Sequence, residues 1–568
     1  MVVLGSGAGG LTAALTASFN GLSCLVLESQ PDIGGTSARS SGTVWIPDNL
    51  YMRAAGRLND RAAAEEYLEA LVSGRERKEM WMRFLDQGPA MLEDLNRRAG
   101  IRFRPFETAP DYRQDMPGAA PGWRPLEPEE FDGKELGDWF DSLARPLPEL
   151  MIFGGMMVTR AEAAQLLKAD RSLKGALLGV RLVARYMAER LTFSRGTRLV
   201  LGNALVARLL KECLSRGVDV RTGITVSRLV VEGGAAAGVE LTRPDGSAKT
   251  VRCGSIVLAG GGFPASAEWR QRELPDPTPA YTPAAPGCVG STLELAMRAG
   301  GVLGGSGMDN GLWFPSSIAK RADGSTAVYP HIILDRAKPG TIAVDASGRR
   351  FVNEGVSYHE FVRGMYRANQ EATAIPAWMI CGRGFIRKYG LGLIRPRTPS
   401  IRKYVESGYL TEAATISELA EKLGMPVGNL TATVARFNDF ARAGIDKDFH
   451  RGETIYDRTN GDASHGPNPS LGPIDEGPFY AVALYPTPLG TSRGLRADVN
   501  ARVLAGDETP IPGLYVCGND MQSAFGGEYP GAGGQLGQAM TFGWIAARHA
   551  ARYLTADPTT GSTQGRSQ

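Results

Sequence analysis

The first 28 residues carry the pattern that most restricts the fold of this chain. MVVLGSGAGG starts as a short apolar segment, breaks at Gly5, Gly7 and Gly10, and runs into small apolar residues typical of a helix packed on a sheet. GLSCLVLE then predicts a second buried strand that ends at Glu28. In such a βαβ unit the glycines permit a tight turn and close approach to a pyrophosphate, and the acid accepts ribose hydroxyls. The order strand, glycines, helix, strand and acid predicts a dinucleotide-binding domain.

Composition excludes several other classes of protein. The chain has 568 residues and a formal net charge of only +3, so we expect no nucleic-acid partner. Its six cysteines are scattered without a C-x-x-C pair, and no basic, apolar leader precedes the first strand. These features favour reduced thiols and a cytoplasmic location. No metal site and no membrane-spanning run is predicted.

One helical segment has an amphipathic pattern that is also found in helices that contact membranes. Lys174, Arg181 and Arg185 recur at helical spacing, and the opposite face carries four apolar side chains, Leu177, Leu178, Leu182 and Val183. The solvated face of an ordinary globular helix is the favoured interpretation. Peripheral contact with the inner face of the membrane is the alternative.

The order of elements along the chain predicts an α/β protein with a discontinuous, Rossmann-like first domain. Residues 60–195 are mostly helical, a meander of strands follows, and CGSIVLAGGGF is a further buried strand closed by Gly260 and Gly261. A Pro-rich passage then leads into a second unit. We predict a cofactor-binding domain from 1–275 and 481–568, and an inserted α+β substrate or catalytic domain from 276–480.

Four motifs in this order resemble the flavoproteins related to fumarate reductase. They are GSGAGG near the start, GGTSARSSGTVWIP at 34–47, SGRRFVNE at 347–354 and IPGLYVCGND at 511–520. Within that superfamily ARSSGTVWIPDN and YPGAG are most similar to the 3-ketosteroid Δ1-dehydrogenases, whose motifs read ARSGG-x-VWIPNN and YPGPG. Members usually carry several residues before the first strand, so the resemblance implies a natural start upstream of Met1.

The resemblance implies FAD as the cofactor, lying extended across the first domain. Glycines allow close backbone contact, and the hydroxyls can bond ribityl oxygens and ring heteroatoms. Besides Gly5, Gly7, Gly10 and Glu28, the implied FAD-binding residues are Gly34, Gly35, Thr36, Ser37, Ser41, Gly42, Val226, Gly260, Gly261, Gly518, Asn519, Gly534 and Leu536. Some relatives attach FAD to a histidine in the early region, but this chain has none before His331, so we predict non-covalent FAD.

The same resemblance implies the catalytic residues. Tyr358 stands where the ketosteroid dehydrogenases carry their base, and Tyr529 and Gly533 of the YPGAG segment stand where they bind the ketone oxygen. Tyr112 of PDYRQDMPG matches a shorter tyrosine loop and is the candidate that assists the base. Tyr358 also occupies the place of the arginine that fumarate reductases use as proton donor, so fumarate reduction is disfavoured.

These residues imply a dehydrogenation that places a C=C bond next to a ring ketone, with a steroid as the leading substrate. Tyr358 would take the proton from the α carbon, Tyr529 and Gly533 would stabilise the enolate oxygen, and the flavin would accept the hydride. Ala532 replaces a motif proline and Arg493 replaces a glycine, so other cyclic ketones remain candidate substrates. Arg493 could meet an acidic group on such a substrate. An ene-reductase running the opposite way and a flavin carrier without turnover are the rivals. The sequence does not identify the electron acceptor.

Overall fold

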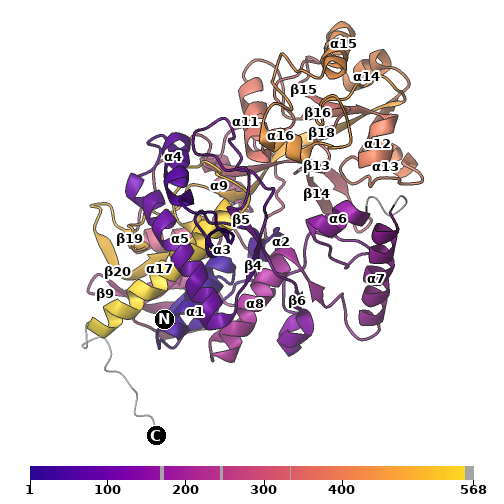
Figure 1. Cartoon of the computed structure of the whole chain (residues 1–568). Coiled ribbons are helices and arrows are strands. Elements are labelled where there is room, and N and C mark those ends of the chain that lie inside the picture. The colour runs from indigo at the N-terminus through magenta and orange to yellow at the C-terminus, as the bar shows by residue number, and fades with distance from the viewer. Residues whose placement is uncertain (167–171, 243–246, 333, 557–568) are drawn as a thin grey trace.

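The computed structural model describes residues 1–166, 172–242, 247–332 and 334–556. It has two lobes, with the first residues and the last helix of the chain in the lower one and the middle of the sequence in the upper one (Figure 1). No helix in these ranges is long and apolar enough to cross a bilayer.

The lower lobe is built on a six-stranded sheet. Its order is β19-β20-β12-β1-β2-β8, and every neighbouring pair is parallel except β19 with β20. The strands are β1 Val2–Leu4, β2 Leu25–Leu27, β8 Asp219–Arg221, β12 Ile256–Leu258, β19 Arg502–Leu504 and β20 Pro510–Val516. Because parallel strands end at a common edge, this sheet brings the loops after β1, β12 and β20 together. Strands from the beginning, middle and end of the sequence thus form one domain.

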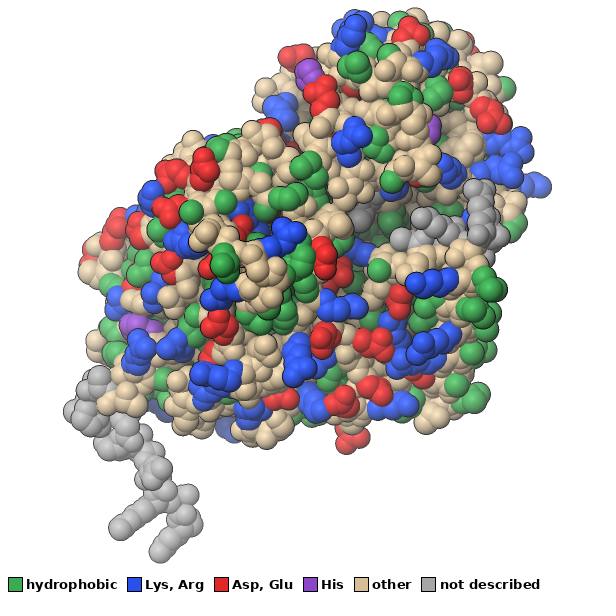
Figure 2. All heavy atoms as spheres, in the orientation of Figure 1, with side chains coloured by type: hydrophobic (Ala, Val, Ile, Leu, Met, Phe, Trp, Pro, Cys, Tyr) green, Lys and Arg blue, Asp and Glu red, His purple; other side chains and the backbone are tan. Residues whose placement is uncertain are grey.

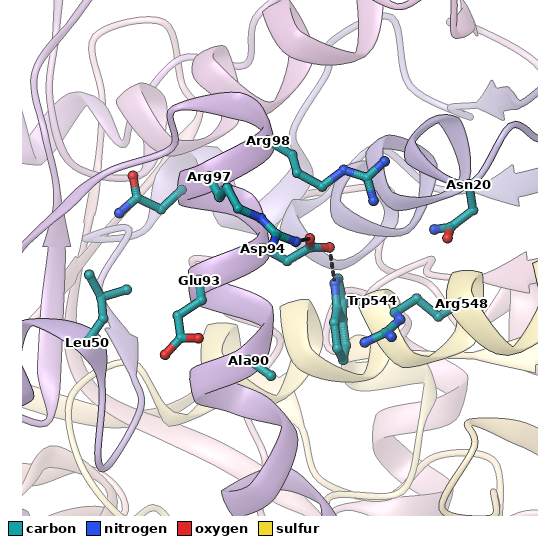
Figure 3. A pocket seen from close by; sticks show the side chains of 10 residues that line it. Asn20, Leu50, Ala90, Glu93, Asp94, Arg97, Arg98, Trp544 and Arg548 are labelled. Atoms are coloured by element: carbon teal, nitrogen blue, oxygen red, sulfur yellow. Dashed lines mark hydrogen bonds and ion pairs between the residues drawn. The ribbon is translucent and has the colours of Figure 1, made fainter.

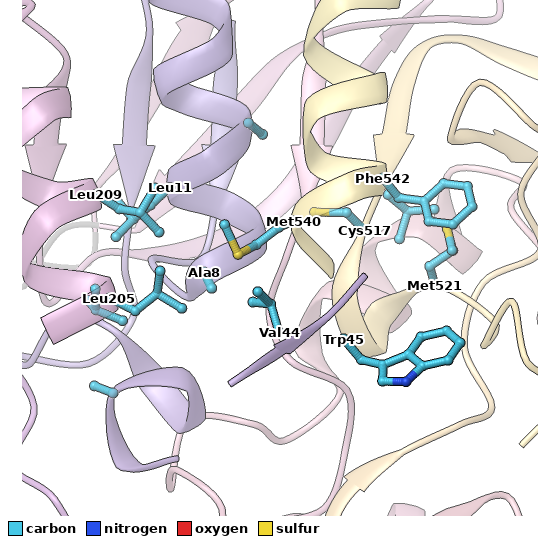
Figure 4. Packing of buried hydrophobic residues seen from close by; sticks show 14 of the residues in the cluster. Ala8, Leu11, Val44, Trp45, Leu205, Leu209, Cys517, Met521, Met540 and Phe542 are labelled. Atoms are coloured by element: carbon cyan, nitrogen blue, oxygen red, sulfur yellow. The ribbon is translucent and has the colours of Figure 1, made fainter. Parts of the chain in front are cut away.

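Three helices cover the sheet: α1 Ala8–Phe19, α8 Leu201–Ser215 and α17 Gly534–Ala556. The first and last cross so closely that a Cβ on Gly543 would lie 2.4 Å from the carbonyl oxygen of Gly9. Apolar side chains of these helices and of Val44 and Trp45 form the core around that crossing (Figure 4). Small residues at the crossing let the apolar stripes meet without a gap.

Further elements of the lower lobe surround this core. Those before β8 are α2 Gly35–Arg39, β3 Val44–Trp45, α3 Leu50–Ala54, α4 Asp60–Val72, α5 Lys78–Ala99, β4 Phe103–Pro105, β5 Pro125–Pro128, β6 Phe131–Asp132, the 3-10 helices Gly133–Phe140 and Pro148–Leu150, α6 Arg160–Leu166, α7 Leu173–Glu189 and β7 Arg198–Leu199. Those after it are β9 Thr225–Glu232, β10 Ala235–Thr242, β11 Ala248–Arg252, α9 Ala267–Glu273, α10 Ser291–Arg298 and the 3-10 helix Gly518–Asp520.

The upper lobe has a second sheet, with the order β14-β13-β18-β16-β15 and with β17 also pairing β18. Its strands are β13 Gly311–Lys320, β14 Thr326–Pro330, β15 Thr341–Val344, β16 Ala377–Gly382, β17 Thr411–Ala413 and β18 Phe479–Thr491. Its helices are α11 Tyr358–Ala368, α12 Arg383–Tyr389, α13 Arg402–Glu406, α14 Ile416–Leu423, α15 Val427–Ala443 and α16 Ile455–Asn460. A separate apolar core lies between this sheet and α14 and α15.

The predicted C-terminal boundary of the inserted unit has to be moved. A boundary between residues 480 and 481 would cut β18, whose residues Gly490 and Thr491 still pair with β13. We therefore propose that the inserted unit extends to Thr491. The predicted α/β class and the initial βαβ unit are confirmed.

Candidate active site

The first glycine turn is closed by backbone packing. Gly5 has a φ of +109°, and a Cβ there would lie 2.2 Å from the carbonyl oxygen of Ala259. A Cβ on Gly10 would lie 2.1 Å from the carbonyl oxygen of Gly5. Any larger side chain at either position would push β1, α1 and β12 apart, so this turn requires glycine.

The acid at the end of β2 is held in a fixed orientation. One carboxylate oxygen of Glu28 accepts hydrogen bonds from the Ser6 backbone N–H (3.0 Å) and hydroxyl (2.6 Å). The other accepts from the Gln30 N–H at 2.9 Å. The predicted residue Val226 is half-buried in β9, two residues past the bond from Ile224 N–H to the Glu28 carbonyl oxygen (2.9 Å). Glu28 and Val226 therefore lie at one end of the candidate cofactor site.

The GGTS segment lies against the amino end of α1. Gly34 precedes α2 with a φ of +107°. The Ser37 hydroxyl accepts a hydrogen bond from the Ala8 N–H (3.0 Å), and the Thr36 hydroxyl accepts one from the Ala285 N–H (2.9 Å). Gly35 has open space on its Cβ side. A little further on, the hydroxyls of Ser41 and Thr43 lie 3.0 Å apart, and Gly42, with a φ of +66°, packs on Leu201 and Gly202. Backbone and hydroxyl groups thus line the turn that follows the first glycines.

A carboxylate that the sequence analysis did not single out connects two strand ends. Asp520 is fully buried, and its two oxygens accept hydrogen bonds from the N–H groups of Gly260 (2.6 Å) and Gly262 (2.8 Å). The predicted residues Gly261, Gly518 and Asn519 belong to the same two turns. The sequence does carry a sign of this role, since Asp520 is the last residue of IPGLYVCGND. An acid placed directly after a buried strand needs hydrogen-bond donors close by.

The polar groups beside these turns fit a large polar cofactor. The Thr491 hydroxyl and the Gln535 side-chain amide nitrogen are buried without a hydrogen-bond partner among the described residues. Thr491 faces Gly262, and Gln535 lies in the first turn of α17 between Gly534 and the half-buried Leu536. Buried donors without partners are costly, so a ligand rich in acceptors fits this place.

Four tyrosines from distant parts of the chain meet in one buried cluster: Tyr112, Tyr358, Tyr456 and Tyr529. The Tyr112 hydroxyl donates a hydrogen bond to the Tyr358 hydroxyl at 2.8 Å. The ring of Tyr112 also lies 5.4 Å from that of Tyr456 and 5.3 Å from that of Tyr529. Tyr358 and Tyr529 contact edge to face at 5.6 Å. The structure therefore brings together the three predicted tyrosines and adds Tyr456, which lies outside all the motifs and gave no signal.

Local structure explains how two of these tyrosines are placed. Tyr358 is the first residue of α11, whose preceding Ser357 hydroxyl accepts from the Glu360 N–H at 3.3 Å. The Tyr112 backbone N–H donates to the carbonyl oxygen of Pro530 at 3.0 Å, which joins its loop to the YPGAG segment. A helix start and a loop-to-loop bond thus direct both phenols to one point.

Gly533 presents a free backbone donor near the cluster. Its carbonyl oxygen accepts from the N–H groups of Trp45 (3.1 Å) and Gly537 (2.8 Å). Within the described residues its own N–H has no acceptor. Its φ is +96°, and a Cβ would lie 2.4 Å from the carbonyl oxygen of Thr43, so the position requires glycine. A half-buried N–H of this kind is suited to bind an oxygen of a ligand.

Burial keeps all four phenols protonated at neutral pH. It raises the pKa of Tyr358 and Tyr112 well above their ordinary value near 10. It raises the pKa of Tyr529 and Tyr456 to about 12, although the cation of Arg160 acts in the opposite direction on both. Removing a proton from the cluster therefore needs positive charge or dipoles close by.

The neighbours of the cluster bear on the expectation that Arg493 could meet an acidic substrate. His359 is buried, and burial lowers its pKa well below the usual value near 6.5, so it is neutral. Arg493 forms an ion pair with Glu273, so its charge is already matched. Of the aromatic residues nearby, Phe314 packs on the Tyr358 ring at 4.6 Å, whereas Trp378 packs against the second core.

A polar surface cavity of about 550 Å³ shares no residue with the tyrosine cluster. It lies between α5 and α17, where Asp94 accepts a hydrogen bond from the Trp544 ring N–H at 2.9 Å and Arg548 stacks on that ring (Figure 3). Its mixed charges do not suit an apolar substrate.

Comparison with known proteins settles the family. Residues 1–536 match the model of the FAD binding domain family. The chain is 36% identical over 562 residues to a 3-oxosteroid 1-dehydrogenase of Mycolicibacterium smegmatis, with 96% of each chain covered. The chain belongs to the 3-ketosteroid Δ1-dehydrogenase family. The resemblance read from the motifs is confirmed, and FAD is the cofactor of this family member.

Other relatives show the range of this family. A crystal structure of 3-ketosteroid Δ1-dehydrogenase from Sterolibacterium denitrificans in complex with 1,4-androstadiene-3,17-dione superimposes with a TM-score of 0.90 at 34% identity, covering 97% of this chain and 99% of that one. A 4-oxocyclohexanecarboxylate 2-dehydrogenase of Sinomonas cyclohexanicum is 37% identical, covering 96% of this chain and 92% of the relative. The names of these relatives include both steroid and one-ring ketones.

Proposed function

We propose that this flavoprotein introduces a C=C bond into a 3-ketosteroid at the 1,2 position. The observation that carries the proposal is the buried contact between Tyr112 and Tyr358, next to Tyr529 and the free N–H of Gly533. Such a reaction removes a proton from the carbon α to the ketone and a hydride from the β carbon. A base and an oxyanion site must therefore act at one place, and this cluster supplies both.

Each residue of the cluster has a role that follows from its chemistry. The Tyr529 hydroxyl and the Gly533 N–H donate to the ketone oxygen, where negative charge develops as the α proton leaves. Tyr358 takes that proton in its phenolate form, and the Tyr112 hydroxyl donates a hydrogen bond that stabilises this phenolate. Tyr358 also begins α11, so the positive end of the helix dipole favours negative charge on it. FAD, when bound, accepts the hydride.

The cofactor would be held by the glycine turns at the carboxyl edge of the parallel sheet. We assign the pyrophosphate to the turn of Gly5, Gly7 and Gly10 and the ribose to Glu28. The segment 34–42 and the first turn of α17 would hold the ribityl chain and the ring. The histidines of this chain are all at position 331 or beyond, so we propose non-covalent attachment.

A one-ring ketone acid is the second candidate substrate, because a dehydrogenase of 4-oxocyclohexanecarboxylate is as similar to this chain as the steroid enzymes. That substrate has a carboxylate, which would need a cation in the site. Arg493 is already paired with Glu273, which leaves Arg160, whose charge acts on the phenols, as the candidate cation. The steroid is favoured because the relative solved with 1,4-androstadiene-3,17-dione superimposes with a TM-score of 0.90.

Anaerobic mixing of the oxidised holoenzyme with 4-androstene-3,17-dione tests the proposal. We expect loss of flavin absorbance near 450 nm and formation of the 1,4-diene. In a parallel experiment, bleaching by 4-oxocyclohexanecarboxylate alone would move the assignment to the one-ring ketone. Rapid reoxidation of reduced enzyme by an enone, with no bleaching by either ketone, would instead support an ene-reductase.

We also propose that α7 contacts a membrane surface, although not through the face read from the sequence. Leu182 is buried, Leu178 and Val183 are half-buried, and of that set only Leu177 is exposed. The outward side carries a different apolar stripe, with exposed fractions of 60–88% for Leu173, Leu177, Val180, Met187 and Leu191. Lys174 and Arg181 are exposed beside it, and the helix's one acidic residue, Glu189, is turned inward to Arg185. Figure 2 shows hydrophobic and basic side chains gathered at the right-hand edge of the molecule, where Figure 1 places α7.

An apolar stripe flanked by cations fits an anionic lipid surface. We expect the holoenzyme to float with phosphatidylglycerol vesicles and less with phosphatidylcholine. Leu177→Glu with Val180→Glu should abolish flotation. Leu58→Glu, at an equally exposed leucine (67%) far along the sequence, should not. Wild-type protein that stays in solution with both lipids would refute the contact.

A further inference from the structure

Arg336 is a buried cation, and the hydrogen-bond partners of its guanidinium among the described residues are backbone oxygens. It is 2% exposed. Its guanidinium donates to the carbonyl oxygens of His331 (2.7 Å), Ile332 (2.9 Å), Glu354 (2.8 Å) and Val356 (3.2 Å). Among the described residues, no carboxylate forms an ion pair with this guanidinium. Burial lowers the pKa of this arginine, and the described side chains of Tyr456, Asp335 and Glu354 act against this without a hydrogen bond to the guanidinium. A buried cation without a directly paired carboxylate is costly, so its presence needs a physical reason.

The contacts of Arg336 place its charge beside the tyrosine cluster. Val356 lies two residues before Tyr358, and Ile332 packs against the cluster. The helix α16, which carries Tyr456, is fixed next to the same loop, because the Lys338 ammonium donates to the Asn460 carbonyl oxygen at 2.7 Å. Arg336 is also the strongest influence that opposes the burial-driven rise in the pKa of Tyr456. The carbonyl oxygens of Ile332 and Val356 therefore hold the guanidinium at the edge of the cluster, where its charge acts on the phenol of Tyr456.

The other charges around the cluster already have partners. Asp335 is bound by the His331 ring nitrogen at 2.7 Å and by the Gly392 N–H at 3.1 Å. Glu354 is paired with Arg350 and Arg451. Arg160 also acts on the phenols, but its side chain is 28% exposed, and it lies 3.9 Å from Glu127. The remaining ionisable neighbours are Tyr529, the neutral His359 and Asp457, which accepts from the Asn353 amide and the Gly452 N–H.

We propose that Arg336 is a positioning residue that stabilises one negative charge shared by Tyr358, Tyr112 and Tyr456. The inference deepens the proposed function and rests on it. Loss of one proton to solvent leaves the cluster with a charge of −1 opposite Arg336. Tyr358 then takes the substrate's α proton and the cluster becomes neutral again, so each turnover releases one proton while the hydride goes to FAD. Because the phenols interact, the proton belongs to the cluster, and the rate reports one apparent pKa for it.

The pH dependence of flavin reduction in the holoenzyme tests this assignment. The first-order rate of bleaching by 4-androstene-3,17-dione is measured from pH 6 to 10 for wild type, Arg336→Met, Arg336→Lys and Tyr456→Phe. We expect Arg336→Met to raise the apparent pKa by at least one unit and to slow bleaching at pH 7 at least tenfold, with recovery toward pH 10. Arg336→Lys should keep the wild-type midpoint, since the charge remains. Tyr456→Phe should raise the midpoint even if Arg336→Met fails to fold.

A second measurement separates proton removal from hydride transfer. With the flavin reduced beforehand by dithionite, deuterium exchange at the α carbon of the ketone in D2O should show the same shifts in midpoint. Arg270→Met is the matched control, because Arg270 is buried, donates to a carbonyl oxygen, and no ionisable group affects its pKa. Unchanged midpoints in Arg336→Met or in Tyr456→Phe would overturn the inference and leave the dehydrogenase standing. Absence of bleaching in wild type would instead remove the proposed function.

Discussion

The hydroxyl of Tyr112 donates a hydrogen bond to the hydroxyl of Tyr358 at 2.8 Å, across 246 positions of sequence. Tyr112 lies on a loop of the cofactor-binding lobe and Tyr358 begins a helix of the other lobe. Their rings contact edge to face at 5.4 Å, and both are buried. The two phenols therefore come together only where the two lobes meet.

Tyr358→Phe should keep FAD and the fold but slow flavin reduction by about 10²–10⁴-fold, because the base is removed without loss of the ring. Stopped-flow absorbance with the steroid substrate measures this. Tyr389→Phe is the control, since it deletes a hydroxyl that donates to Asp462 at 2.7 Å outside the cluster. Equal rates for the two variants would exclude Tyr358 as the base.

Alkaline pH should destabilise the protein through its buried phenols. The pKa of Tyr456 and of Tyr529 is raised to about 12, above the value near 10 of an unfolded chain. A raised pKa gives stability that is complete below pH 10 and is lost as pH rises toward 12. Tyrosinate absorbance near 295 nm should therefore show that, beyond the one proton that the cluster loses in the folded protein, the buried phenols titrate only as the circular dichroism of the fold is lost. Full titration at pH 10 with the fold intact would contradict this.

Asp520→Asn should weaken FAD binding by roughly tenfold or more. An asparagine keeps one acceptor and replaces the other with a donor, so either the Gly260 or the Gly262 N–H loses its partner, at about 1–3 kcal/mol. Fluorescence of released FAD during dilution measures the affinity. Asp507→Asn, at an exposed turn, should bind FAD as the wild type does. Equal affinities for FAD would mean that the turns after β12 and β20 hold their conformation without the Asp520 carboxylate.

Arg363→Met should lower the free energy of unfolding by about 3–5 kcal/mol, because it leaves the buried Asp309 carboxylate unpaired and Glu528 paired with Arg75 alone. Arg363 is 5% exposed and forms ion pairs with Asp309 and Glu528, both at 2.8 Å. Urea unfolding followed by circular dichroism measures the loss. Arg402→Met removes an exposed ion pair and should cost less than about 1 kcal/mol. A similar small loss in both variants would refute the stabilising role of this network.

Acid precipitation of the purified protein should release all of its yellow colour into the supernatant, because we propose that FAD is bound without a covalent bond and the chain has no histidine before position 331. Absorbance near 450 nm in the pellet and the supernatant decides the result. Colour that stays with the denatured chain would show a covalent bond.

The sequence by itself determined the cofactor fold and the family. The pattern from Gly5 to Glu28 is local, and its glycines are required by contacts within one βαβ unit, so spacing alone was sufficient. Three of the four clustered tyrosines were found the same way, since each lies in a short segment that resembles a family motif.

Only the tertiary structure decided which other side chains surround those tyrosines. Tyr456 and Arg336 stand outside the motifs, and they reach the cluster because α16 and the loop after β14 pack together in the upper lobe. Burial, which depends on contacts between residues far apart in the sequence, also decided that His359 is neutral, that Arg493 is paired with Glu273, and which face of α7 is exposed. A periodic pattern gives the faces of a helix, but only packing selects the face that meets the core.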